Sequence, residues 1–168
     1  MAGTDGELLR ESTGIGGAGC RLAAVVRGMH IRPASASDAP SLASLASELG
    51  YPAGPQAVSR RLALLAQPDH AVFVAEAGGE AIGFVHVHAR RLLVAEPFAE
   101  LGGLVVSSGA RRQGAGSALL RAARDWARAG HLSPLRIRAN MLRDEAHPFY
   151  TSQGCRHAKD QHVYEVEP

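Results

Sequence analysis

The sequence predicts one domain of the α/β or α+β class, in which helices pack against a mixed sheet. Three observations carry this prediction. Apolar strand patterns alternate with helical patterns, two strand patterns flank a Gly78-Gly79 turn, and a glycine-bearing loop leads directly into an amphipathic helix. The length of 168 residues suits a single domain that buries most of its apolar surface.

The domain is expected to span residues 29–168. Residues 1–28 contain the glycine-rich run 14–19 and show no sustained helical or strand period. We expect them to be a flexible, poorly ordered leader, or translated sequence upstream of a natural start at Met29. An extra strand or helical turn over residues 22–26 is the alternative.

The first half of the domain shows one strand pattern and two helical patterns, separated by turn residues. The expected order is a strand over 29–33, a helix from a Ser37 or Asp38 cap to Gly50, a turn over 51–55 and a helix over 58–66.

The second half places strands around an amphipathic helix over residues 117–129, which Gly130 ends. Arginines 121, 124 and 128 are expected to face outward, and Leu119, Leu120, Ala123, Trp126 and Ala127 inward. A last helix is expected over 144–153, where Pro148 predicts a late or irregular start. The remaining elements are strands over 71–77, 81–88, 98–106, 135–139 and 162–166, and a connecting segment over 90–97.

The segment from Leu104 to Gly116 has the features of an anion site. An apolar strand runs through a polar turn into a loop that contains Gly114, and a helix follows. Glycines let the backbone approach a ligand closely and adopt positive φ. The helix start then offers unpaired N–H groups and the positive end of its dipole to a phosphate. No Gly-Lys-Ser/Thr follows the loop, which excludes a nucleotide-binding P-loop.

The chain from Met29 to about Val166 resembles the GNAT superfamily of acetyl-coenzyme-A-dependent N-acetyltransferases. Arg111-x-x-Gly114-x-Gly116 looks like the pyrophosphate loop of that family, and Ala146-x-x-Phe149-Tyr150-x-x-x-Gly154 follows it. The resemblance implies a GNAT-like, mainly antiparallel sheet of about six to seven strands flanked by about four helices. Within the superfamily, the chain looks most like small-amine acetyltransferases, such as the aminoalkylphosphonate and aminoglycoside branches.

The resemblance also implies acetyl-coenzyme A as the cosubstrate. Its pyrophosphate is expected on the N–H groups of the helix start, with charge-assisted contacts from two arginines, and its pantetheine arm on the preceding strand. Asn140 matches a position that often hydrogen-bonds the cofactor, with a turn asparagine as the alternative. The expected cofactor-binding residues are Leu104, Val105, Val106, Arg111, Arg112, Gln113, Gly114, Ala115, Gly116, Ser117 and Asn140.

Tyr150 is the expected general acid and Glu100 the expected general base. A phenol with a pKa of about 10 keeps its proton at neutral pH and can donate it to a departing thiolate. A carboxylate can accept the amine proton, directly or through water. In a regular strand Glu100 shares a face with Leu104 and Val106, unless a bulge at the intervening glycines breaks the phase. The alternatives are a packing tyrosine and a solvated strand-end acid.

Other polar residues leave the acceptor open. His86 and His88 share a strand face, where they could bind a metal, relay a proton or lie at a wet surface; no metal site is predicted. In the family, the loops that match residues 51–56 and 90–97 line the acceptor cleft. Arginines 90 and 91 suit an acidic acceptor, whereas Glu96 suits a cationic one.

Composition argues against nucleic acid and membrane partners, because the net charge is only +2 and no apolar run approaches the roughly 20 residues of a membrane span. Cys20 and Cys155 lack metal or disulfide spacing and indicate reduced thiols in the cytoplasm. The predicted function is acetylation of a primary amine of a small molecule, with a homodimer as an option. The alternatives are a coenzyme-binding sensor or interaction module without turnover and, among enzymes, aminoglycoside or protein N-terminal acetylation.

Overall fold

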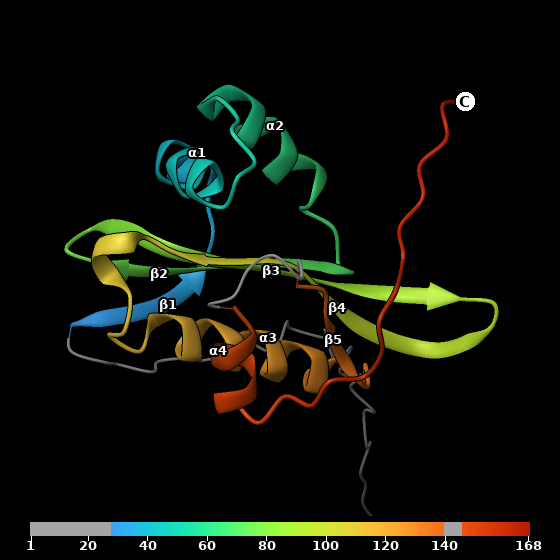
Figure 1. Ribbon diagram of the computed structural model, residues 1–168. Coiled ribbons are helices and arrows are strands. Elements are labelled where there is room, and N and C mark those ends of the chain that lie inside the picture. The colour runs from blue at the N-terminus through green and yellow to red at the C-terminus, as the bar shows by residue number, and fades with distance from the viewer. Residues whose placement is uncertain (1–27, 140–145) are drawn as a thin grey trace, which may run out of the picture.

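A five-stranded sheet with helices on both faces forms the domain (Figure 1). The computed structural model describes residues 28–139 and 146–168, and the structural statements below concern these ranges. The elements are β1 (Met29–Pro33), η1 (Ala36–Asp38), α1 (Ala39–Glu48), α2 (Pro55–Leu64), β2 (His70–Ala77), β3 (Glu80–Leu92), β4 (Ala95–Val106), η2 (Ser108–Ala110), α3 (Ala115–Ala129), β5 (Leu135–Ile137) and α4 (Ala146–Ser152).

The strands follow one another across the sheet in chain order. Neighbours from β1 to β4 are antiparallel, and β4 and β5 are parallel. The predicted turn between β2 and β3 is confirmed, since Gly78 and Gly79 adopt φ of +61° and +84°, which side chains disfavour. The mixed, mainly antiparallel α+β class is therefore confirmed, with five strands rather than six or seven in the described ranges.

Two predictions about strands are wrong. Residues 155–168 form neither helix nor strand and run away from the sheet as the red tail of Figure 1, so the strand expected over 162–166 is missing. An alternating pattern makes a strand only where a sheet edge accepts its hydrogen bonds, and this tail meets none. The connecting segment expected over residues 90–97 is also wrong. Strands β3 and β4 extend through most of it and form a hairpin, whose tip is the exposed pair Leu93 and Val94. The tip extends past the core, so burial imposes no alternation there.

Apolar side chains divide between the two faces of the sheet. One core cluster joins the sheet to α3, and its members include Val85, Val87, Leu119 and Leu120. The other joins the opposite face to α1 and α2 and includes Leu42, Leu45 and Val74. Figure 1 shows the same layers, with α1 and α2 above the sheet and α3 and α4 below it.

Helix α3 confirms the predicted inward face. Four of the five expected residues are buried, and Trp126 packs against them partly exposed. The helix begins at Ala115 rather than at residue 117. Arg124 corrects the expectation of an outward arginine, because it donates to the carbonyl oxygen of Gln153 at 2.7 Å and to the Cys155 Sγ at 3.5 Å. This contact ties the segment after α4 to α3.

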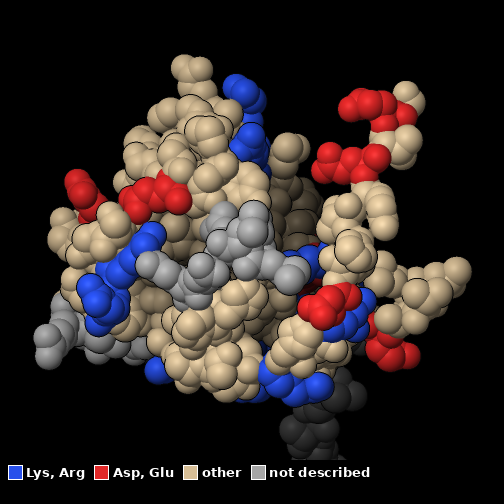
Figure 2. Space-filling model, viewed as in Figure 1, with Lys and Arg blue, Asp and Glu red and all other residues tan. Residues whose placement is uncertain are grey.

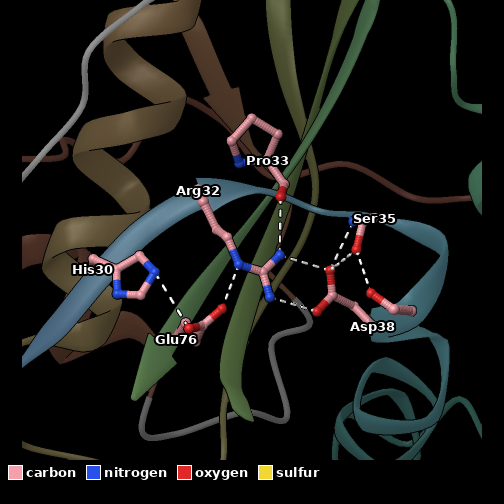
Figure 3. Close-up of polar contacts among 7 residues, drawn as sticks. His30, Arg32, Pro33, Ser35, Asp38 and Glu76 are labelled. Carbon is pink, nitrogen blue, oxygen red and sulfur yellow. Dashed lines mark hydrogen bonds and ion pairs between the residues drawn. The ribbon is translucent and has the colours of Figure 1, made fainter. Parts of the chain in front are cut away.

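A partly buried ion-pair network fixes the start of α1 (Figure 3). Arg32 of β1 donates to both oxygens of Asp38 at 2.7 and 2.8 Å and also to Glu76 of β2. Asp38 stands at the N-cap of α1, as predicted, but its carboxylate accepts from the Ser35 amide at 2.7 Å instead of capping the helix. Arg32, by its hydrogen bonds, lowers the pKa of Asp38 to about 2, against the opposing effect of burial.

No helix in the described ranges combines the length and the apolar character that a membrane span needs.

Candidate active site

Strand β4 has a strand on both sides only along part of its length. Residues 99–101 pair with Leu135–Ile137 of β5, and that pairing then ends. From Gly102 to Val106, the only strand paired with β4 in the described part of the chain is β3. The other edge of β4 therefore offers backbone N–H and C=O groups to an extended ligand.

A bulge at Gly102 changes which way the β4 side chains face. His86 lies opposite Gly103 whereas Val87 lies opposite Leu101, so Gly102 is the extra residue. Leu104 and Val106 pack on the α3 side of the sheet, and Glu100 lies on the α1–α2 side beside its cross-strand neighbour His88. The prediction that Glu100 and Leu104 share one face of a regular strand is therefore wrong. The alternative, a bulge at the glycines between them, is confirmed.

Gly102 is also required by the space around it. A Cβ atom built on this residue would lie 2.4 Å from Nδ1 of His86, closer than any real contact of that kind. The bulge and the missing side chain together make room for the His86 ring.

The start of α3 lies just past the end of β4. Gly114 is its N-cap with φ of +89°, a conformation that favours glycine, and it has no side chain to cap the helix. Ala118 donates to the carbonyl oxygen of Gly114 at 3.0 Å, so the amides of Ala115, Gly116 and Ser117 precede the first hydrogen bond within the helix. These amides and the helix dipole favour an anion.

Basic side chains surround this helix start. Arg111 and Arg112 are exposed, and Figure 2 shows basic side chains over the segment that leads into α3. The Arg111 Nε also approaches the carbonyl oxygen of Val106 at 3.4 Å. Gln113 is exposed as well, and its side-chain amide donates to the Gly109 carbonyl at 3.2 Å. The loop therefore presents positive charge beside the open edge of β4.

Helix α4 lies against the start of α3. A Cβ on Gly116 would lie 3.2 Å from Cζ of Phe149 and 3.8 Å from a methyl of Val106. Tyr150, partly buried, has its ring centroid 5.2 Å from that of Phe149 in an edge-on arrangement. The described part of this helix is Ala146–Ser152, with Pro148 as its third residue; residues 140–145 lie outside the described ranges, so the late or irregular start expected from Pro148 stays a prediction. Phe149 was part of the sequence motif without a predicted role, and its contact with Gly116 supplies one.

Glu100 is buried and held by polar neighbours. Only 8% of the residue is exposed. One carboxylate oxygen accepts from the Nε of Arg138 at 3.0 Å, and the other lies 3.8 Å from the Nε2 of His88. Burial is the main cause that lowers the pKa of His88, against the attraction of Glu100.

Three histidines lie together on the face that carries Glu100. The rings of His70, His86 and His88 stack with centroids 5.3 to 5.4 Å apart, and Nδ1 of His70 lies 3.1 Å from Nε2 of His86. Burial, aided by the two neighbouring histidines, lowers the pKa of His86 to about 4. His70 was missed from the sequence: counted back from the Gly78 turn in a regular register it would lie opposite Val87, and the register shift between Ala75 and Glu76 places it opposite His88.

Comparison with known proteins shows the family of this chain. A model of the acetyltransferase (GNAT) family matches residues 39–155. The chain belongs to this family. No protein of curated function matches it.

Solved structures similar to this GNAT acetyltransferase share its fold at low identity. An aminoglycoside 6'-N-acetyltransferase from Acinetobacter haemolyticus has a TM-score of 0.72 at 21% identity, with 83% of this chain and 99% of that one covered. Glucosamine-6-phosphate N-acetyltransferase from Arabidopsis thaliana gives 0.71 at 17%, with 83% and 99% covered. A transcriptional regulator from Bacillus halodurans gives 0.75 at 20%, with 82% and 99% covered.

The predicted site residues of this GNAT acetyltransferase fall into two groups. Phe149 adjoins the start of α3, and its neighbour Tyr150 packs against the core cluster on the α3 side, as Leu104 and Val106 at the end of β4 also do. Glu100 lies on the opposite face of the sheet with the histidines. Asn140 lies outside the described residues.

Proposed function

We propose that this GNAT acetyltransferase moves an acetyl group from acetyl-coenzyme A to a primary amine of a small molecule. The observation that supports this most directly is the end of the β4–β5 pairing at Leu101, ahead of the point where Gly116 at the start of α3 lies near both Val106 and Phe149. An open strand edge that leads to a helix N-terminus suits a ligand with an extended amide-bearing arm and a phosphate group.

The residues present fit this cosubstrate. The backbone of Leu104, Val105 and Val106 would pair with the pantetheine arm, and the amides of residues 113–117 would hold the pyrophosphate. Arg111 and Arg112 would add charge-assisted hydrogen bonds, and Asn140 a further one. The bound cosubstrate supplies an activated acetyl thioester.

Two side chains would move protons. The carboxylate of Glu100, oriented by Arg138, would accept a proton from the amine, and the phenol of Tyr150 would give its proton to the departing sulfur. Because they belong to opposite faces of the sheet, the amine would approach from the α1–α2 face and the thiolate would leave on the α3–α4 side. A direct attack of this kind needs no nucleophilic side chain.

A thiol-release assay tests the proposal. Purified protein and acetyl-coenzyme A would be mixed with aminoglycosides, aminoalkylphosphonates, polyamines, amino acids and short peptides, with Tyr150→Phe as the control. We expect one small-amine class to release thiol, and Tyr150→Phe to lower kcat by about 100-fold with little change in the KM for acetyl-coenzyme A. Equal rates for Tyr150→Phe would refute its role. Silence across the panel, with acetyl-coenzyme A still raising Tm, would favour the binding-module alternative.

A cytoplasmic location and a homodimer remain predictions, which cell fractionation and light scattering test.

A further inference from the structure

The three histidines come from two neighbouring strands and meet on the α1–α2 face. His70 begins β2, and His86 and His88 lie two residues apart on β3, directly beside it. Each offers one ring nitrogen, and these three atoms all lie within 4.8 Å of one another. The rings are partly buried, with 27% of the His70 side chain and 16% of the His88 side chain exposed. Solvent can therefore reach the cluster.

Both ring nitrogens of His70 and His88 have polar or buried surroundings that acetyl transfer does not require. His70 places Nδ1 toward His86 and Nε2 at 3.9 Å from a carboxylate oxygen of Asp69. His88 places Nε2 at 3.8 Å from Glu100, and its Nδ1 is buried with no hydrogen-bond partner in the described structure. A histidine that ligates a metal characteristically turns its other nitrogen to a carboxylate. Two of the three histidines have a carboxylate near the second nitrogen, at distances longer than a hydrogen bond, and one carries an unsatisfied buried nitrogen.

We propose that His70, His86 and His88 form a three-histidine site for a divalent transition-metal ion of the zinc type. This inference does not depend on the proposed acetyl transfer, and it departs from the sequence prediction that the chain holds no metal. Imidazole nitrogens suit zinc, copper, nickel and iron, whereas magnesium and calcium prefer oxygen ligands. Three histidines with a fourth position open to water or substrate are a known zinc arrangement.

The distances suit such an ion after a small adjustment. With Zn–N bonds of about 2.0–2.1 Å, two ligand nitrogens of a tetrahedral site lie about 3.3 Å apart. The His70–His86 pair already stands at 3.1 Å. The widest separation in the set is at most 4.8 Å, so the rings need to close by about 1.5 Å at most, which rotation of partly exposed side chains allows.

Neighbouring charged side chains have opposite effects on a cation in this site. Asp69 and Glu100 attract a cation near His88, and Arg90 on the same strand face repels it. Gly102 contributes by its size, because any side chain there would displace the His86 ring. The site lies beside Glu100, so a bound ion would stand on the face where the amine is proposed to approach.

Titration with Co²⁺ and Zn²⁺ tests this site on tag-free, chelator-treated full-length protein. We expect one equivalent of Co²⁺ to produce the visible absorption bands of a tetrahedral nitrogen site, and Zn²⁺ to displace it stoichiometrically. Single substitutions His70→Gln and His86→Gln should each weaken binding at least about 10-fold. The matched control is His157→Gln, an exposed histidine near Asp160 after α4, which should bind like the wild type.

Two results would overturn the proposal. One is the absence of tetrahedral bands and of any Zn²⁺-dependent rise in Tm in wild-type protein. The other is unchanged binding in both His70→Gln and His86→Gln. Far-UV circular dichroism of each variant separates lost ligation from lost folding. Because binding is read from spectra and from Tm, failure of this test would leave the acetyl-transfer proposal untouched.

Discussion

At the scale of single residues, Gly102 links the strand to both groups of the site. It is the extra residue of the β4 bulge, so it sets Glu100 on one face of the sheet and Leu104 on the other. Its missing side chain leaves the space that the His86 ring occupies. One small residue therefore determines the orientation of a proposed base and the position of a proposed ligand.

Gly102→Ala is expected to lower the free energy of unfolding by about 1–3 kcal/mol, because a Cβ 2.4 Å from Nδ1 of His86 must displace the ring or the strand. Urea denaturation measures the change. Gly109→Ala is the control, since nothing lies within 4 Å of a Cβ there, and it should cost less than about 0.5 kcal/mol. Equal losses in the two variants would contradict the crowding at Gly102.

At the scale of elements, the connection between β4 and α3 depends on backbone conformation rather than on side chains. Gly114 closes the loop with positive φ and starts the helix whose free amides face the proposed phosphate site. A side chain at this residue would strain the loop and turn those amides away.

Gly114→Ala is expected to raise the KM for acetyl-coenzyme A by about 10-fold and to cost about 1 kcal/mol of stability. Gly79→Ala is the matched control, because Gly79 has φ of +84° with open space around it and lies in the β2–β3 turn. It should cost similar stability with no change in KM. Steady-state kinetics and urea denaturation of the two variants compare these effects, and a KM increase in both would show general loosening instead.

The Arg32–Asp38 pair holds the start of α1 against the sheet. It should make the free energy of unfolding depend on pH. The pKa of Asp38 falls from its ordinary 3.8 to about 2 on folding, so its stabilisation is complete above pH 4 and is lost as pH falls through 2. We expect Asp38→Asn to lose about 1 kcal/mol at pH 7, an amount reduced by solvent screening at the partly exposed Arg32. Unfolding curves of both proteins should converge at pH 2. A constant difference from pH 7 to pH 2 would count against the ion pair.

At the scale of the whole molecule, the face proposed for the amine carries excess positive charge. Arg90, Arg136 and Arg138 lie around Glu100 on this side of the sheet, with Arg136 over the ring of Phe98. The Nε of Arg90 is buried without a hydrogen-bond partner in the described ranges. Such a surface favours an acceptor that carries an acidic group besides its amine.

An aminoalkylphosphonate is therefore expected to exceed the alkylamine of equal length that lacks the phosphonate group in kcat/KM by about 10-fold or more. Arg90→Gln should reduce that ratio while leaving the rate with the plain amine nearly unchanged. The thiol-release assay measures both. A polycationic aminoglycoside as the best acceptor would contradict the charge argument.

Much of this fold and site could be predicted from local patterns. The order of elements from β1 to α4, the inward face of α3 and the glycine loop follow from periodicity, helix dipoles and the conformational freedom of glycine, which act within a few residues. The hairpin tip at Leu93 and the tail after residue 154 were predicted wrongly. Strand pairing depends on a partner edge that local pattern does not specify.

The sequence alone determined the family, and its resemblance to that family singled out the loop from Arg111 to Gly116 as a candidate pyrophosphate site and Tyr150 and Glu100 as proton-transfer candidates. Only the tertiary structure decided that a bulge separates Glu100 from Leu104, that β4 loses β5 beyond Leu101, and that His70 joins His86 and His88. These are properties of register between strands. A shift by one residue moves a side chain to the other face, and hydrogen bonds between distant segments set that shift.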